Sequence, residues 1–140
     1  MREYSEALVK NKKFDRFVED FTDNWLDLRN IDFTSPDRTL FPEFDHYLKY
    51  SMLEETRAYV RRMFLENLPI SNLVKSDFAM LNERLARHYG VAGVVGNTYR
   101  QVALADETRG GLLGQSSVLM LGSTGKDSHP IRRAVWLIQY

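Results

Sequence analysis

The run Arg109-Gly110-Gly111 is the part of this sequence whose residue types best suit ligand chemistry. The apolar segment after it predicts a helix beginning near the two glycines, and a helix start offers unpaired backbone amides and a positive dipole end. A guanidinium group beside such amides would suit an anion. Lys126 and His129 would lie nearby if the last two helices pack together. The same packing would bring in three further arginines, Arg100, Arg132 and Arg133.

The competing interpretation of Arg109 is structural. Its guanidinium would pair with Asp106 or Glu107, or would hold the loop to a backbone carbonyl. Because surface charges commonly form such pairs, we favour this interpretation over an anion site.

Two glycine-containing stretches look like nucleotide-binding loops but lack the required residues. A phosphate loop reads G-x-x-x-x-G-K-[ST], whereas "LGSTGKDSHP" has Met120 at the first glycine position and the anionic Asp127 at the hydroxyl position. The glycines of "GVAGVVG" are spaced G-x-x-G-x-x-G after a helix, unlike the dinucleotide fingerprint. We interpret both stretches as connections. Gly122 and Gly125 would turn the chain, and the ring of His129 would accept an amide hydrogen bond at the start of the last helix.

Metal and haem ligation within this chain are not expected. His46, Tyr50 and Glu54 would align on one helix face, but this combination is a weak metal signal. Met52 and Met63 recur at helical spacing, which favours core packing over haem ligation. The chain has no cysteine, so it cannot hold a disulfide, a thiolate metal site or a covalently attached c-type haem.

No catalytic residue is identified. Ser116-Ser117 does not sit in a G-x-S-x-G elbow that follows a strand. Glu54-Glu55 and Asp106-Glu107 are adjacent in sequence rather than placed across a cleft, so we expect them to be solvated charges.

The composition is that of a globular domain with a substantial core. The chain has 140 residues, of which 44% are hydrophobic, and these include eight Phe, seven Tyr and two Trp. Nineteen basic and 19 acidic residues give zero net charge, which argues against binding to nucleic acid or to an anionic membrane. No apolar run approaches the length of a membrane span, and the charged residues 1–11 do not resemble a signal peptide.

The spacing of apolar residues predicts an all-α fold of about five helices, with an irregular segment near residues 90–108. Helices are expected over residues 12–30, from Pro42 to near Asn67, over residues 76–90 with Ser76 or Asp77 as the cap, over 110–123, and from Pro130 onward. In the irregular segment, "TYRQVAL" could form a short extended piece. The chain stops inside the last helix, which we interpret as truncation of a longer protein.

Four segments together resemble a known family. In order along the chain they are "FVEDFTDNWLDLRNIDFTSPDRTLFPEFDHYLKYSMLEET", "LNERLARHYGV", "YRQVAL" and "RGGLLGQSSVLMLGSTGKDSHPIRRAVWL". They look like the adjoining pair of uncharacterised domains in large secreted cytochrome-containing proteins of planctomycetes and related bacteria. By this resemblance, residues 1–75 are the C-terminal part of the first domain. Residues 76–140 are the second domain, truncated at its C-terminus, and the two form one compact unit. His129-Pro130 and Arg133-Ala134 replace the Ser-Pro and Arg-Gly of the family pattern.

The resemblance implies a periplasmic or secreted protein with a c-type haem elsewhere in the full-length polypeptide, and no cofactor in this chain. We expect a non-catalytic structural or interaction segment that packs against other domains of the same polypeptide. One alternative is that the segment forms part of the pocket of a periplasmic oxidoreductase or other enzyme, complete only in the full-length protein. Arg109, Lys126 and His129 would then contact the ligand. Another is an independent ligand-binding helical module.

Overall fold

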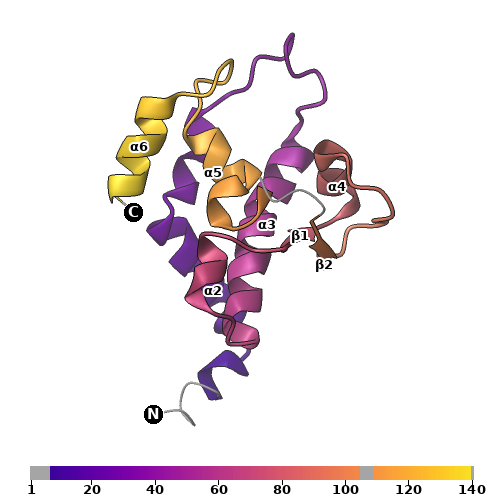
Figure 1. Ribbon diagram of the computed structural model, residues 1–140, viewed down its shortest axis with the longest axis vertical. Coiled ribbons are helices and arrows are strands. Elements are labelled where there is room, and N and C mark those ends of the chain that lie inside the picture. Colours follow the sequence, from indigo (N-terminus) through magenta and orange to yellow (C-terminus); the bar gives the residue numbers. More distant parts are fainter. Residues whose placement is uncertain (1–6, 105–108, 140) are drawn as a thin grey trace.

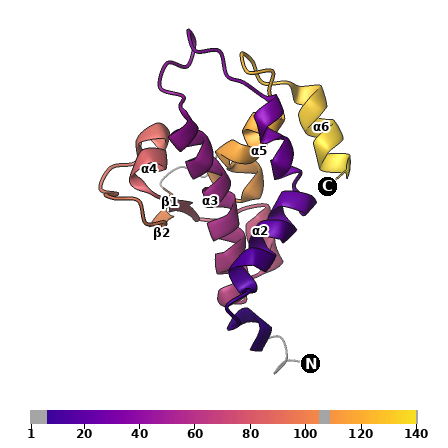
Figure 2. The same cartoon turned by 180° about the vertical axis from the view of Figure 1, so that it is seen from behind.

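A central helix organises the chain in the computed structural model, which describes residues 7–104 and 109–139. This helix is α3 (His46–Leu65), and α2 (Phe14–Trp25), α4 (Glu83–Tyr89) and α5 (Ser116–Leu121) all pack against it. Figures 1 and 2 show α4 and the strands on one side of α3, and α6 (Pro130–Gln139) at the outer edge of the other side. Short 3-10 helices at Leu28–Phe33 (η1), Ile70–Leu73 (η2) and Leu112–Gly114 (η4) connect these elements.

The core consists of three clusters of buried apolar side chains, and each cluster contains a residue of α3. Leu48 and Met52 belong to the first cluster, Val60 to the second and Tyr59 to the third. Leu48, Met52 and Tyr59 are separated by four and seven residues, which places them on one helix face, and Val60 borders that face. The burial of Met52 also confirms that it packs in the core.

The start of α3 lies after the proline that was expected to open it. Asp45 is the N-cap, and its Oδ1 accepts a hydrogen bond of 2.6 Å from the Leu48 N–H. An aspartate in this position satisfies one of the free amides at the helix start, which explains why the helix begins at His46 rather than at Pro42. The expected end near Asn67 is close, because α3 ends at Leu65.

The all-α prediction is wrong, because the chain also forms a two-stranded antiparallel sheet. Strand β1 (Phe78–Leu81) pairs with β2 (Arg100–Ala103), with Phe78 opposite Ala103 and Leu81 opposite Arg100. The fold is therefore mixed, although rich in helix. All four residues of β1 are buried, and an apolar run buried on both faces has no periodicity that distinguishes strand from helix. The extended piece expected within "TYRQVAL" is confirmed as β2.

The helix predicted over residues 76–90 is correspondingly shorter, because Asn82 starts α4 after the strand. The Asn82 Oδ1 accepts from the Leu85 N–H at 2.9 Å, while its Nδ2 donates to the Ser51 hydroxyl at 3.0 Å. At the other end of α4, Gly90 adopts a left-handed conformation with φ of 71°, as expected for a helix stop.

The single helix expected over residues 110–123 is replaced by η4 and α5. Between them Gln115 has extended backbone angles, and its buried side-chain Oε1 accepts a hydrogen bond of 2.6 Å from the Thr56 hydroxyl. The Thr56 hydroxyl also lies 2.6 Å from the Ser117 hydroxyl. In this arrangement, with α5 starting at Ser116, the buried polar side chains of Thr56, Gln115 and Ser117 have hydrogen-bond partners.

Helix α6 begins as the sequence predicted, with Pro130 in its first turn. The ring Nδ1 of His129 accepts a hydrogen bond of 3.2 Å from the Arg132 N–H, which confirms the expected hydrogen bond at the start of this helix. The helix is tied to the rest of the molecule by Trp136, whose indole N–H donates to the Leu26 carbonyl at 3.1 Å. Within the described part of the chain, no helix is both long and apolar enough to cross a membrane.

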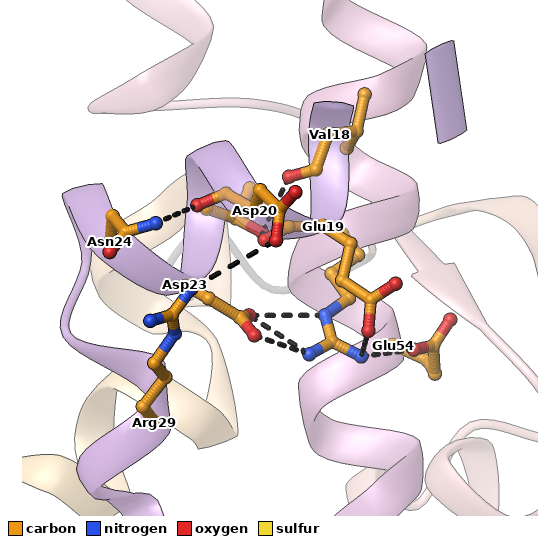
Figure 3. Close-up of polar contacts among 9 residues, drawn as sticks. Val18, Glu19, Asp20, Asp23, Asn24, Arg29 and Glu54 are labelled. Atoms are coloured by element: carbon orange, nitrogen blue, oxygen red, sulfur yellow. Dashed lines mark hydrogen bonds and ion pairs between the residues drawn. The ribbon is translucent and has the colours of Figure 1, made fainter. Parts of the chain in front are cut away.

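A cluster of charges joins α2 to α3 and supports the arrangement of the core (Figure 3). The Arg57 guanidinium lies 2.8 Å from an Asp23 carboxylate oxygen, 2.7 Å from Glu54 and 3.4 Å from Glu19. The side chains of Arg57 and Asp23 are only 16% and 14% exposed. Because both charged groups are largely removed from water, each loses hydration free energy, and the attraction between them offsets that loss.

Replacing Arg57 with methionine should lower the free energy of unfolding by about 1 to 3 kcal/mol. The substitution leaves three neighbouring carboxylates without their shared cation, while it keeps the aliphatic volume. Urea unfolding followed by circular dichroism measures the loss. The matched control is Arg61→Met, since Arg61 pairs with Asp15 at 2.8 Å but these side chains are 50% and 66% exposed. The control should lose no more than about 0.5 kcal/mol, and equal losses would contradict the assigned role of Arg57.

Candidate functional site

A cavity of about 380 Å³ lies between the segment that precedes α3 and the turn that joins α5 to α6. Phe41 and Phe44 come from the first of these segments, and Leu48 and Met52 from the start of α3. Met120 of α5 adds to the same wall. The side chains of Leu48, Met52 and Met120 are buried in the core, so they give the cavity a fixed apolar wall.

Charged side chains surround this apolar wall. Arg109, Lys126 and Arg133 line the cavity together with the acidic Glu43 and Asp127. The Lys126 ammonium also lies 3.4 Å from an Asp37 carboxylate oxygen.

Arg109 is held in place by an aromatic ring. Its guanidinium carbon stands 4.6 Å from the centre of the Tyr89 ring, a cation–π arrangement that orients the group without neutralising it.

A buried acid adjoins the cavity. Glu55 of α3 is 1% exposed, and its Oε2 accepts a hydrogen bond of 2.7 Å from the Tyr89 hydroxyl. The Tyr89 oxygen in turn accepts from the backbone N–H of Ser116, a residue that lines the cavity, at 3.0 Å. Burial raises the pKa of Glu55 to about 8, although Tyr89, Ser116 and Arg109 oppose the shift, so the carboxyl is mainly protonated at neutral pH.

The structure brings together only part of the predicted anion site. Arg109 and Lys126 line the same cavity, and Arg133 joins them. Gly110 lies in a neighbouring open depression that Arg109 and Arg133 also border. His129 does not line the cavity, because its ring caps α6.

The Gly111 amide, expected to bind an anion, already has a protein partner. Helix α5 begins at Ser116 rather than at the glycines, and the Gly111 N–H donates to the Ser76 hydroxyl at 3.0 Å. The expected partners of Arg109, Asp106 and Glu107, lie outside the described residues.

The other arginines and histidines have separate places. Arg100 on β2 donates to the Val95 carbonyl at 2.6 Å, and Arg132 donates to the Ser123 carbonyl at 3.2 Å. His46 is the exposed first residue of α3. Glu54, its proposed co-ligand, is bound to Arg57. Over residues 7–104 and 109–139, no group of three or more metal-ligating His, Asp or Glu side chains is found.

Sequence reasoning missed Glu55 and Tyr89. Glu55 was expected to be solvated, and this expectation is wrong because α3 turns it into the core. The available signal was its position: it falls three residues after Met52 and four before Tyr59, on the same apolar stripe. A charged residue on such a stripe indicates a buried acid with a polar partner.

The comparisons with known proteins identify a family but no activity. No curated protein and no solved structure matches the chain. Residues 1–91, about two thirds of the chain, match the family model PSD4, described as a protein of unknown function (DUF1592). The chain therefore belongs to the PSD4 (DUF1592) family.

Proposed function

We propose that this chain is a non-catalytic structural or interaction segment of a larger secreted bacterial protein that carries a c-type haem elsewhere. Its α6 would dock against another domain of the same polypeptide. The observation that carries the proposal is the exposure of α6. None of its residues is buried, and Ile131 and Ile138 are 71% and 86% exposed.

The exposed side chains of α6 form a surface that favours a covering partner. Val135 and Leu137 are also exposed, so apolar groups extend around much of the helix. A helix of this kind gains free energy when another element covers it. The helix is nevertheless fixed on the body, because the Trp136 indole is hydrogen bonded to the Leu26 carbonyl. It thus presents a positioned surface rather than a loose end.

The wider setting of the proposal rests on the resemblance of the quoted motifs to domains of cytochrome-containing planctomycete proteins. In such a protein, secretion signals and haem attachment would be encoded in other segments. The neighbouring coding sequence tests this setting: a C-x-x-C-H run and a signal peptide support it, and a gene without either would contradict it.

The docking of α6 is tested by hydrogen exchange of residues 130–139 in this chain alone and in the full-length protein. We expect slower exchange in the full-length protein, by at least about tenfold, because a covering domain suppresses local opening. In the full-length protein, the double variant Ile131→Lys/Ile138→Lys should restore fast exchange. It should leave the stability of the isolated chain nearly unchanged, since both side chains are exposed. Equal exchange rates in the two forms would contradict docking.

A second candidate function is that the segment supplies part of an enzyme pocket completed in the full-length protein. The cavity with Arg109 and Lys126 favours this candidate. Haem absorbance and reduction of the full-length protein, compared with a form that lacks this segment, separate the two. Unchanged haem properties support a scaffold, and altered substrate-dependent reduction supports a pocket.

A further inference from the structure

We propose that the cavity between the segment before α3 and the α5–α6 turn binds a small organic acid with one carboxylate and an apolar body. The inference goes beyond the docking of α6, because it concerns a cavity and a small-molecule ligand, although Arg133 of α6 is among the residues that line the cavity. It rests on three observations: the size of the cavity, its apolar wall and the two arginine side chains that line it.

The size of the cavity and its apolar wall determine which kind of apolar group a ligand could place in it. A volume of about 380 Å³ is near the lower end of the range, roughly 300 to 1,000 Å³, that small-molecule sites occupy. The wall contains Phe44, Leu48, Met52 and Met120, whose side chains offer no hydrogen bond donor. A short aliphatic chain or a single aromatic ring would be removed from water against these side chains.

The charges around the cavity select the head group. Three cationic side chains, Arg109, Lys126 and Arg133, line the cavity together with the acidic Glu43 and Asp127, and Lys126 is already paired with Asp37 at 3.4 Å. A ligand carboxylate would therefore bind to the guanidinium groups of Arg109 and Arg133 rather than to Lys126. A phosphate dianion would meet the repulsion of the two acids, and the Gly111 amide is already bound to the Ser76 hydroxyl.

Arg109 is the residue best placed to select a carboxylate. The Tyr89 ring, 4.6 Å from the guanidinium carbon, restricts where the group lies, and a guanidinium can bind a carboxylate through two parallel hydrogen bonds. The adjacent Glu55 would otherwise compete as a counter-ion. Its raised pKa removes that competition at neutral pH, because the protonated carboxyl carries no charge.

The test is isothermal titration of the protein at pH 7 with octanoate. Two control ligands test the carboxylate and the apolar chain of octanoate separately. Acetate has the carboxylate but lacks the long chain, and octylammonium has the chain but carries a positive charge. We expect octanoate to bind with a Kd below about 1 mM and both controls to bind at least about tenfold more weakly. Absence of octanoate binding at about 10 mM would overturn the proposal. Tighter binding of octylammonium would contradict the charge assignment, and equal binding of acetate would contradict the apolar wall.

A pair of variants locates the binding. Arg109→Gln should weaken octanoate binding by at least about tenfold, because it removes a charge-assisted pair. Arg29→Gln makes the same change of charge at a surface residue that does not line the cavity, and should leave binding unchanged. Equal effects of the two variants would assign the binding to net charge and overturn the site. Circular dichroism melting of both variants confirms that they are folded.

The outcome is independent of the proposed docking function. Loss of octanoate binding in Arg109→Gln leaves the hydrogen exchange of α6 unaffected. Conversely, failure of α6 docking would leave the titration with octanoate unaffected, since Arg133 is the one residue of α6 among the described residues that line the cavity.

Discussion

Raising the pH from about 5 to about 9 is expected to lower the free energy of unfolding by an amount on the order of 5 kcal/mol. The cause is Glu55, whose pKa rises from 4.5 to about 8 on folding, mainly because burial disfavours its charged form. A raised folded-state pKa contributes stability that is fully present below the unfolded-state value of 4.5. This stability is lost as the pH rises toward 8. The expected loss is a large part of the stability of a domain of this size.

Urea unfolding at several pH values measures this dependence, and Glu55→Gln identifies its source. Glutamine mimics the protonated carboxyl and can still accept from the Tyr89 hydroxyl. The variant should match the native chain near pH 5 and exceed its stability by several kcal/mol near pH 9. The matched control is Glu66→Gln on the exposed residue after α3, which should keep the native pH profile. Parallel profiles of Glu55→Gln and the native chain would rule out Glu55 as the cause.

On the acidic side, a different group limits stability. The Leu48 N–H hydrogen bond lowers the pKa of Asp45 below its ordinary value of 3.8. Burial opposes this lowering by a smaller amount than the hydrogen bond supplies, and the Arg84 guanidinium reinforces the lowering. A group whose pKa is lowered by folding stabilises the folded state at pH values above its unfolded-state pKa. This stabilisation is lost as the pH falls through the folded-state pKa. Since Asp45 and Glu55 act in opposite directions, we expect maximal stability near pH 5.

Replacing Gly111 with alanine should lower the free energy of unfolding by about 3 kcal/mol or more. Gly111 has φ of 78° and ψ of 179°, a conformation that is essentially restricted to glycine. A Cβ atom there would lie 2.5 Å from the Val74 carbonyl oxygen and 2.6 Å from its carbon. Both obstacles belong to the backbone, so relief requires the segment after η2 to move away from η4.

The matched control for this substitution is Gly93→Ala. Gly93 also has positive φ, 84°, but no atom lies within 4 Å of the position of its Cβ. The Gly93→Ala substitution should lower the free energy of unfolding by only about 1 to 2 kcal/mol, the cost of placing a Cβ atom at positive φ. Thermal and urea unfolding of both variants give the difference, which measures the close approach at Gly111. Equal losses would show that conformation, and not contact with Val74, restricts this position.

The helices were largely predictable because their apolar residues recur at helical steps. The stripe from Leu48 to Val60 gave the buried face of α3, and Gly90 and Pro130 marked one helix end and one helix start. Strand β1 was not predictable in the same way. Its four residues are buried on both faces, and it becomes a strand by pairing with β2 about 20 residues later.

The candidate site was predictable only in part. Arg109 and Lys126 were named from their charge, and both line the cavity. The amides of Gly110 and Gly111 were named from an expected helix start that the structure moves to Ser116. That shift depends on the contact of Gln115 with Thr56, a residue 59 positions away, which local patterns do not reveal.

The sharing of α3 among all three core clusters has a consequence for synthesis in the cell. In the second cluster, Phe14 and Val18 pack with Leu112 and Val118, which follow about 100 residues later. In a chain growing on the ribosome, the side chains of Phe14 and Val18 therefore lack these partners until Leu112 and Val118 have left the exit tunnel. During that interval the nascent segment is a natural client for a holding chaperone.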